Sequence, residues 1–268
     1  MAWNGTSTKS LQVVGLLCLL FFTSPSFSAD WSTTEAHFTY GNLDTPTFAG
    51  GGDSDTFILT LQHASGWKYG DNFFFVDFLN SDDRNFNDSD IYGEWYPNFS
   101  IGKIRGKEIS AGPIRDVGIL AGINWGADAK VRKFLPGVRL ALDLPGFAFA
   151  NLDITAYIDD SEGVSRGGAP KEDDSFMIDF NFAYPFEIGK HAFSVEGHIE
   201  YIGERDDEFG NEVSEHILAQ PQFRWDVGHA RGWPNQLFIG IEWQYWRNKL
   251  GDKDTDESAP QALVVWRF

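Results

Sequence analysis

Segments of about ten residues in which apolar and polar side chains alternate recur from Glu35 to the last residue, Phe268. In 176–184 the even-numbered positions are aromatic or aliphatic, and the residues between them include Asp179 and Asn181. Successive side chains of a strand point to opposite faces, so each segment has one apolar and one polar face. Such strands must cover their apolar face with either a protein core or lipid.

We predict twelve such strands, and an even number is what single-chain bacterial barrels require. The candidates run about ten residues, whereas strands of soluble proteins usually have about five or six. Charged residues also recur on the polar face of strand after strand. These features favour an all-β, antiparallel transmembrane β-barrel over a soluble sandwich or a secreted enzyme. The predicted strands are 35–43, 55–64, 71–80, 90–101, 116–125, 136–144, 151–159, 176–184, 191–201, 215–226, 237–246 and 260–268.

Aromatic residues gather near the predicted strand ends, as expected for girdles at the two membrane interfaces. The chain also stops on a strand, with Val264, Trp266 and Phe268 on one face. In lipid the last strand must pair with the first so that no edge is left open. The residues assigned to the girdles are Trp67, Tyr69, Tyr92, Trp95, Tyr96, Trp225, Trp243 and Trp246.

The amino-acid composition agrees with a barrel wall that is apolar on the lipid side and polar on the lumen side. Aromatic residues make up 16% of the chain and charged residues 22%, and the mean hydropathy is -0.29. The formal net charge is -18. This excludes nucleic acid as an expected partner, because a binder must neutralise phosphates with Lys and Arg.

Residues 1–28 are predicted to be a signal peptide that precedes a single barrel domain, 29–268. Lys9 stands before the apolar run 11–22, and Ser26 and Ser28 supply small residues for cleavage. The single cysteine, Cys18, lies inside the apolar run, and Leu17 before it disfavours a lipoprotein cleavage site. We therefore expect an integral protein of the Gram-negative outer membrane, without a cofactor.

Connections between the predicted strands alternate in character. Short ones carry basic residues, namely 65–70, the segment around Lys103, Arg105 and Lys107, 188–191 and 228–235. Long ones are mostly acidic, namely 80–90, 160–174, 203–212 and 250–258. Outer-membrane barrels have short periplasmic turns and longer extracellular loops, so the acidic loops are predicted to face outward. There they either bind the divalent cations of lipopolysaccharide or simply keep the loops solvated.

Several side chains are predicted to line the lumen as substrate-binding candidates. Phe73, Phe75 and Asp77 share a face, and a charge on the lipid side would cost about 2–4 kcal/mol at the midplane. The two Phe rings then either stack on a solute or fill the lumen as packing. The alternative for the charged candidates is a structural role, in which they form ion pairs that stabilise the barrel wall. His198 lies between Glu196 and Glu200, but one histidine flanked by two carboxylates on a single strand is not enough to predict a metal site. The further candidates are Glu94, Asp153, Tyr157, Asp179, Glu196, His198, Glu200, Arg224 and Glu242.

Four stretches carry a family resemblance: 56–80, 91–113 with its Glu94, Pro97 and Ser100 pattern, 214–219 and 264–268. Together they resemble the nucleoside-specific channel-forming proteins of the Tsx type, which include related phage-receptor barrels. The resemblance implies a monomeric, narrow, twelve-stranded barrel. It also implies passive uptake of nucleosides through weak sites of aromatic and ionisable side chains.

Alternative functions are a generic or other-substrate porin, and a surface receptor or adhesin whose loops bind phage or other surface ligands. A barrel enzyme is disfavoured, because His63 with Ser65 and His216 with Ser214 are neighbours on one strand and do not form a triad. We expect a channel and not an enzyme. Its expected partners are outer-membrane lipid, lipopolysaccharide and small solutes.

Overall fold

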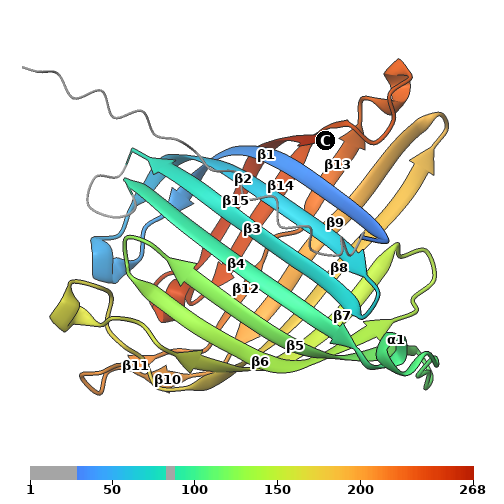
Figure 1. The fold of residues 1–268 in the computed structure, drawn as a ribbon. Coiled ribbons are helices and arrows are strands. Elements are labelled where there is room, and N and C mark those ends of the chain that lie inside the picture. The colour runs from blue at the N-terminus through green and yellow to red at the C-terminus, as the bar shows by residue number, and fades with distance from the viewer. Residues whose placement is uncertain (1–28, 83–87) are drawn as a thin grey trace, which may run out of the picture.

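The computed structural model of the protein describes residues 29–82 and 88–268, which form almost entirely antiparallel strands (Figure 1). The predicted signal peptide, 1–28, lies outside the described residues. The strands are β1 (Trp31–Asp44), β2 (Asp53–Trp67), β3 (Gly70–Ser81), β4 (Ser89–Ser100), β5 (Ile114–Gly126), β6 (Val131–Leu142), β7 (Phe149–Asp159), β8 (Ser175–Ile188), β9 (His191–Ile202), β10 (Arg205–Asp206), β11 (Glu212–Val213), β12 (His216–Ala219), β13 (Gln222–Asp226), β14 (Leu237–Arg247) and β15 (Glu257–Arg267).

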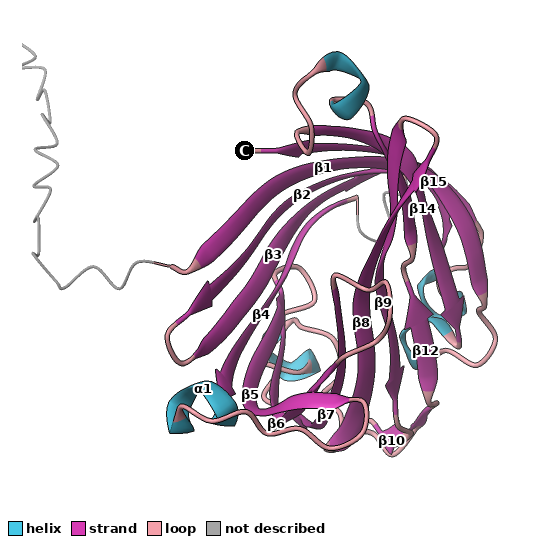
Figure 2. Cartoon of the chain, turned by 90° about the vertical axis from the view of Figure 1, so that its right-hand side faces the viewer, coloured by secondary structure: helices cyan, strands magenta, loops and turns pink. Residues whose placement is uncertain are grey.

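The main sheet closes on itself (Figure 2). β1 pairs with β2 on one side and with β15 on the other, where Glu35 lies opposite Arg267. The sheet has thirteen strands. Two of them, β12 and β13, both lie between β9 and β14 and together make one barrel strand, which is interrupted at Gln220 and Pro221. We call each such full-length position around the barrel a stave. The barrel therefore has the twelve staves that the alternation predicts, and each predicted segment overlaps one of them.

Helices are few and short, and they lie between the staves. No helix within 29–82 and 88–268 is long and apolar enough to cross a bilayer. They are η1 (Thr47–Ala49), α1 (Ile101–Arg105), η2 (Val164–Arg166), η3 (His229–Arg231) and η4 (Lys249–Gly251).

The outer wall is apolar and the inner wall is polar, as predicted. On β14, Ile239 and Ile241 are 46% and 51% exposed, whereas Glu242 and Gln244 are 8% and 7% exposed. The predicted faces of β7, β8 and β9 are likewise confirmed, since Ile154, Ile178 and Ile199 are exposed on the outside. Exposed aliphatic and aromatic side chains suit a lipid environment, so the barrel presents the surface of a membrane-spanning wall.

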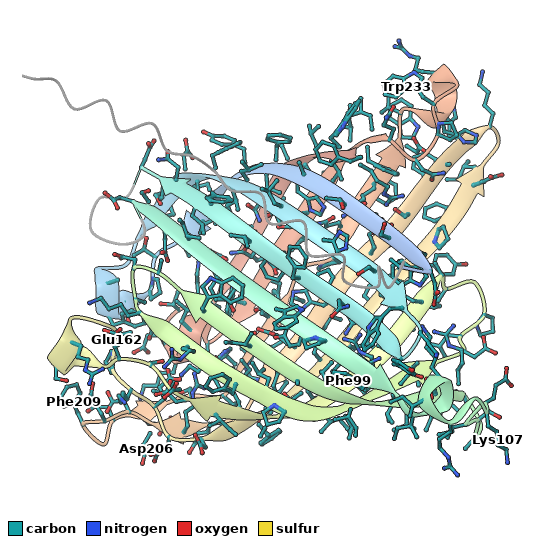
Figure 3. All side chains as sticks on the ribbon, in the orientation of Figure 1. Phe99, Lys107, Glu162, Asp206, Phe209 and Trp233 are labelled. Atoms are coloured by element: carbon teal, nitrogen blue, oxygen red, sulfur yellow. The ribbon has the colours of Figure 1, made fainter. Side chains whose placement is uncertain are left out.

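The two ends of the barrel differ in charge. Figure 3 shows Lys107 and Trp233 at the end of the barrel where β1 begins and β15 finishes, and Glu162, Asp206 and Phe209 at the opposite end. We call these the terminal end and the loop end. The predicted basic connections lie at the terminal end. The predicted acidic ones lie at the loop end, except that 83–87 of the 80–90 connection fall outside the described residues. Their predicted lengths are wrong in one case, because 101–113 is a long terminal-end connection that contains α1.

Candidate functional site

Aromatic side chains of β3 and β4 line one side of the lumen. Phe73 and Phe75 have ring centroids 6.0 Å apart, and Phe75 lies 6.1 Å from Tyr92. Strand pairing places Tyr96 opposite Phe73. We call Phe73, Phe75, Tyr92 and Tyr96 the aromatic wall. The inward direction predicted for the two Phe residues is thus observed.

The girdle assignment of Tyr92 and Tyr96 is wrong, as is that of Trp246, which shares the inner face of Glu242 and Gln244. Both tyrosines share the face of Glu94, and Tyr96 is only 7% exposed. The hydroxyl of Tyr92 donates to Glu94 Oε1 at 2.6 Å, and that of Tyr96 donates to Asn124 Oδ1 at 2.8 Å. Position near a strand end had suggested a girdle, whereas period-two spacing from Glu94 would have placed both rings in the lumen.

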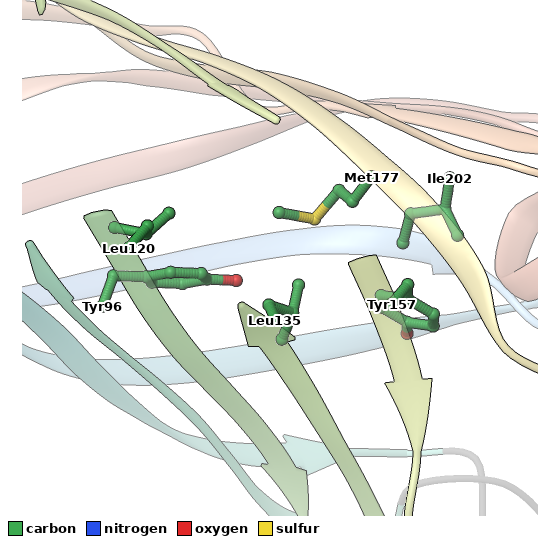
Figure 4. Packing of buried hydrophobic residues seen from close by; sticks show 6 residues of the cluster. All are labelled: Tyr96, Leu120, Leu135, Tyr157, Met177 and Ile202. Carbon is green, nitrogen blue, oxygen red and sulfur yellow. The ribbon is translucent and has the colours of Figure 1, made fainter. Parts of the chain in front are cut away.

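Part of the lumen is filled by packing (Figure 4). Tyr157, a predicted lumen residue, belongs to this cluster, and Phe73 packs against it. The packing interpretation therefore holds for Phe73, whereas Phe75 lies outside the cluster. The cluster consists of Tyr96, Leu120, Leu135, Tyr157, Met177 and Ile202, one residue from each strand from β4 to β9.

Carboxylates line the side formed by β7, β8 and β9. Strand register aligns Asp153 with Asp179, and Asp179 with Glu200. We call these three residues the acidic wall. His198 lies beside them, with its Nδ1 3.0 Å from Asp179 Oδ1. Burial of several carboxylates in one place raises their electrostatic free energy unless cations or hydrogen-bond donors compensate for it.

The aromatic and acidic walls face each other across the barrel interior. Glu94 of β4 interacts electrostatically with His198 and Asp179, although β4 is not paired with β8 or β9 in the sheet. Asp77 lies on the aromatic side, where it accepts a hydrogen bond from Thr60 at 2.5 Å. A solute between the walls would meet rings on one side and carboxylates on the other.

Three of the predicted lumen residues are engaged in ion pairs that hold the wall. Arg139, which sequence reasoning did not single out, binds Asp153 through two nitrogens at 2.7 and 2.8 Å. Arg224 lies 3.2 Å from both Glu35 and Glu196. The structural reading therefore fits Asp153, Glu196 and Arg224. Arg139 carries no local signal beyond its place on the polar face of its strand.

Amide side chains continue this polar lining around the lumen. Glu242, another predicted lumen residue, accepts hydrogen bonds from Gln222 at 2.5 Å and from Gln261 at 3.0 Å. All three side chains are buried. Glu242 is therefore supported by neutral donors instead of by an ion pair.

At the loop end, the 160–174 loop is held down by an inward-pointing carboxylate. Glu172 binds Lys133 Nζ at 2.5 Å and Arg205 Nε at 2.8 Å. Both cations lie over the ring of Tyr157, at 5.2 and 5.3 Å from its centroid. Burial raises the pKa of Glu172, but the two cations outweigh it and hold that pKa below its ordinary value. The loop is thus tethered beside the mouth of the lumen.

The histidines considered for an enzyme are in packing roles. His63 bonds the Thr34 hydroxyl at 2.8 Å and stacks on Phe74, on the outer wall. His216 packs against Trp246, with ring centroids 5.7 Å apart. The Ser214 hydroxyl donates to Glu212. These contacts give neither histidine the arrangement of a general base beside a nucleophile.

Comparison with known proteins gives one family match over most of the chain. The profile described as "Nucleoside-specific channel-forming protein, Tsx" matches residues 28–265. No curated protein matches the sequence significantly.

Solved structures with a similar chain trace include the NanC porin, at 10% identity and a TM-score of 0.49, covering 87% of this chain and 97% of that one. The KdgM porin has 8% identity and a TM-score of 0.44, covering 87% and 99% of the two chains. An outer membrane channel from Pseudomonas putida F1 has 9% identity and a TM-score of 0.45, covering 91% and 99%.

Proposed function

The chain belongs to the family of nucleoside-specific channel-forming proteins of the Tsx type, and on that premise we propose that it is an outer-membrane channel for the passive uptake of small solutes, with nucleosides as its preferred substrates. The observation that carries this proposal is the aromatic wall facing the acidic wall. A nucleobase has apolar faces that stack on rings, and a ribose has hydroxyls that donate to carboxylates. The lumen offers both kinds of contact on opposite sides.

Phe75, Asp77, Glu94 and His198 are the residues we propose to contact the solute. Phe75 lies outside the packed cluster, and Asp77 and Glu94 each accept one side-chain hydrogen bond. Such groups provide modest contacts, and conduction requires binding weak enough for release. The excess of carboxylates favours neutral or cationic solutes over anions.

We further propose that the acidic loop end faces the exterior and the basic terminal end faces the periplasm. Long outer loops and short inner turns are the usual arrangement in such barrels. In this orientation the acidic loops meet lipopolysaccharide and its divalent cations, and solutes reach the lumen past the tethered 160–174 loop. We propose that the barrel works as a monomer.

Single-channel recording in planar bilayers tests the function. We expect a small conductance that adenosine or uridine reduces reversibly, because a bound nucleoside occupies the lumen. The substitution Phe75→Leu should weaken adenosine block by a factor of about 5 to 150, since stacking of a base on a ring contributes about 1–3 kcal/mol. The matched control is Phe74→Leu, which removes a neighbouring ring from the outer wall and should leave block unchanged.

A large conductance that nucleosides do not alter would instead identify a generic porin. Equal effects of Phe74→Leu and Phe75→Leu would show that the aromatic wall does not contact the solute. Liposome swelling with nucleosides, sugars and amino acids then ranks the solutes that pass.

A further inference from the structure

Asp179, His198 and Glu200 form a compact cluster on the inner wall. Among the described residues, these three can each offer one ligand atom such that all the atoms lie within 4.8 Å of one another. Two come from β9 and one from β8, and their registers fix them side by side. Glu196, the other carboxylate two positions from His198, lies outside the cluster and pairs with Arg224.

Hydrogen bonds beyond the cluster determine which nitrogen of His198 carries a hydrogen. Glu257 is paired with Lys249 at 2.6 Å and accepts a hydrogen bond from Gln244 Nε2 at 2.7 Å. Gln244 therefore presents its Oε1 to Gln220 Nε2, at 3.1 Å. Gln220 in turn presents its own Oε1 to His198 Nε2, at 3.0 Å. An amide oxygen only accepts, so Nε2 must be the donor.

This chain of hydrogen bonds depends on a close approach between β9 and the interrupted stave. Gly197 has a φ of 142°, and a Cβ there would lie 2.2 Å from the carbonyl oxygen of Gln220. Any larger residue would push the two strands apart. Glycine therefore allows Gln220 to reach His198.

With the hydrogen on Nε2, the lone pair of His198 Nδ1 faces Asp179 Oδ1 at 3.0 Å. Both atoms are then acceptors, so a proton or a metal ion must lie between them. A proton would satisfy Nδ1 and Asp179 alone. Glu200 would still be without a partner: its side chain is 91% buried, since its exposure is 9%, and no described residue gives it a hydrogen bond or ion pair. Arg139, which pairs with the acidic wall through Asp153, is engaged with Asp153 and Asp71.

We propose that Asp179, His198 and Glu200 bind a divalent first-row transition metal ion such as Zn²⁺, through His198 Nδ1 and one oxygen of each carboxylate. Imidazole with carboxylates is a ligand set that suits Zn²⁺, and three protein ligands leave a position open to the lumen. Gln220 on Nε2, and Asn181 on Asp179 Oδ2 at 2.7 Å, supply the outer hydrogen bonds that orient metal ligands. Rotation of the Glu200 side chain closes the set on the ion.

A bound ion would neutralise part of the acidic wall and lower the conductance for cations. Glu94 faces the cluster from the opposite side of the lumen. The ion would therefore lie on the path of the solute. This inference rests on the fold and the contacts, and does not depend on nucleosides being the substrate.

Direct Zn²⁺ binding to the tag-free, detergent-folded protein tests the proposal, measured by competition with a chromophoric chelator. We expect one Zn²⁺ per chain that millimolar Mg²⁺ does not displace. His198→Gln and Glu200→Gln should each weaken binding at least tenfold. Gln220→Leu keeps all three ligands and should weaken it about 10- to 100-fold, because it removes an outer hydrogen bond. His229→Gln, an exposed histidine at the terminal end, is the matched control and should bind as the unaltered protein does.

Heat-dependent migration in gels verifies that each variant is a folded barrel. If the folded protein binds no Zn²⁺, or binds it equally well after His198→Gln, the cation in the cluster is a proton and the metal proposal is overturned. Displacement by Mg²⁺ would also overturn it, since it would indicate a diffuse electrostatic site. Adenosine block recorded in metal-free buffer is a separate readout, so failure here and failure of the channel proposal are distinguishable.

Discussion

Arg139 illustrates how single side chains divide between holding the barrel wall and meeting solutes. Arg139 is 7% exposed and Asp153 is 2% exposed, so both charges have given up most of their hydration. Each compensates the other through a two-nitrogen contact. Within 29–82 and 88–268, Asp77, Glu94 and Glu200 have no such arginine partner. Two of the residues proposed to contact solutes, Asp77 and Glu94, are thus carboxylates that the ion pairs of the wall do not use.

Replacing Arg139 with Leu is expected to destabilise the barrel by about 3–5 kcal/mol, because it leaves Asp153 buried without a counter-charge. Urea unfolding in lipid vesicles measures the change. The double variant Arg139→Leu with Asp153→Leu should recover much of the loss, since no buried charge then remains. If the double variant is as unstable as the single one, the uncompensated charge is not the cause.

At the level of elements, the loops of the loop end are attached to the lumen wall through buried charges. Glu172 joins the 160–174 loop to Lys133 on β6 and to Arg205 on β10. Asp207 organises the neighbouring turn by accepting backbone hydrogen bonds from Phe209 and Asn211. These contacts fix the loops beside the mouth, so we expect them to limit the size of solutes that enter.

Glu172→Gln should release the loop, which lowers the fluorescence anisotropy of a probe attached at Ser165→Cys. Glu162→Gln is the matched control. Glu162 is exposed, and its ion pair with Lys130 is long, at 3.8 Å, and solvated. The pKa of Glu172 is held below its ordinary 4.5. The tether is therefore complete above about pH 4.5 and is lost as the pH falls through the lowered value. Anisotropy that is unchanged in both tests would mean that other contacts hold the loop.

For the whole molecule, closure decides the fold. Glu35 of β1 binds Arg267 of β15 and Arg224 of β13, so three staves meet at one buried carboxylate. The backbone N–H of Phe268 donates to Thr34 O at 3.0 Å, which pairs the end of the chain with its first strand. With every edge of the main sheet paired, its backbone is satisfied and the outer wall can be apolar throughout.

A charge placed on the outer wall should report the depth of the bilayer. Ile241→Lys, at the middle of β14, is expected to cost about 2–4 kcal/mol of folding free energy. Leu237→Lys, on the same face at the end of the strand, should cost about 0–1 kcal/mol. Guanidinium titration of the equilibrium between unfolded protein and protein folded into lipid vesicles gives both free energies. Equal costs would show that the outer wall is not in a membrane at the assumed depth.

The amino-acid sequence alone determined the number of staves and the face of nearly every strand. Alternation is a local property, because each side chain's direction follows from its parity along the strand. This is why alternation predicts that Phe75, Asp77 and Asp179 point inward, as they do in the structure. The exceptions, Tyr92, Tyr96 and Trp246, followed from giving strand ends more weight than parity.

Only the tertiary structure decided which lumen residues meet. Asp179 became the partner of His198, and Glu196 was drawn to Arg224, because strand register sets the neighbours across a sheet and a shift of one residue would exchange them. The approach of Glu94 to His198 depends further on the closure and curvature of twelve staves. Pairing between strands far apart in the sequence is not encoded in any one segment, so the site emerges only when the barrel closes.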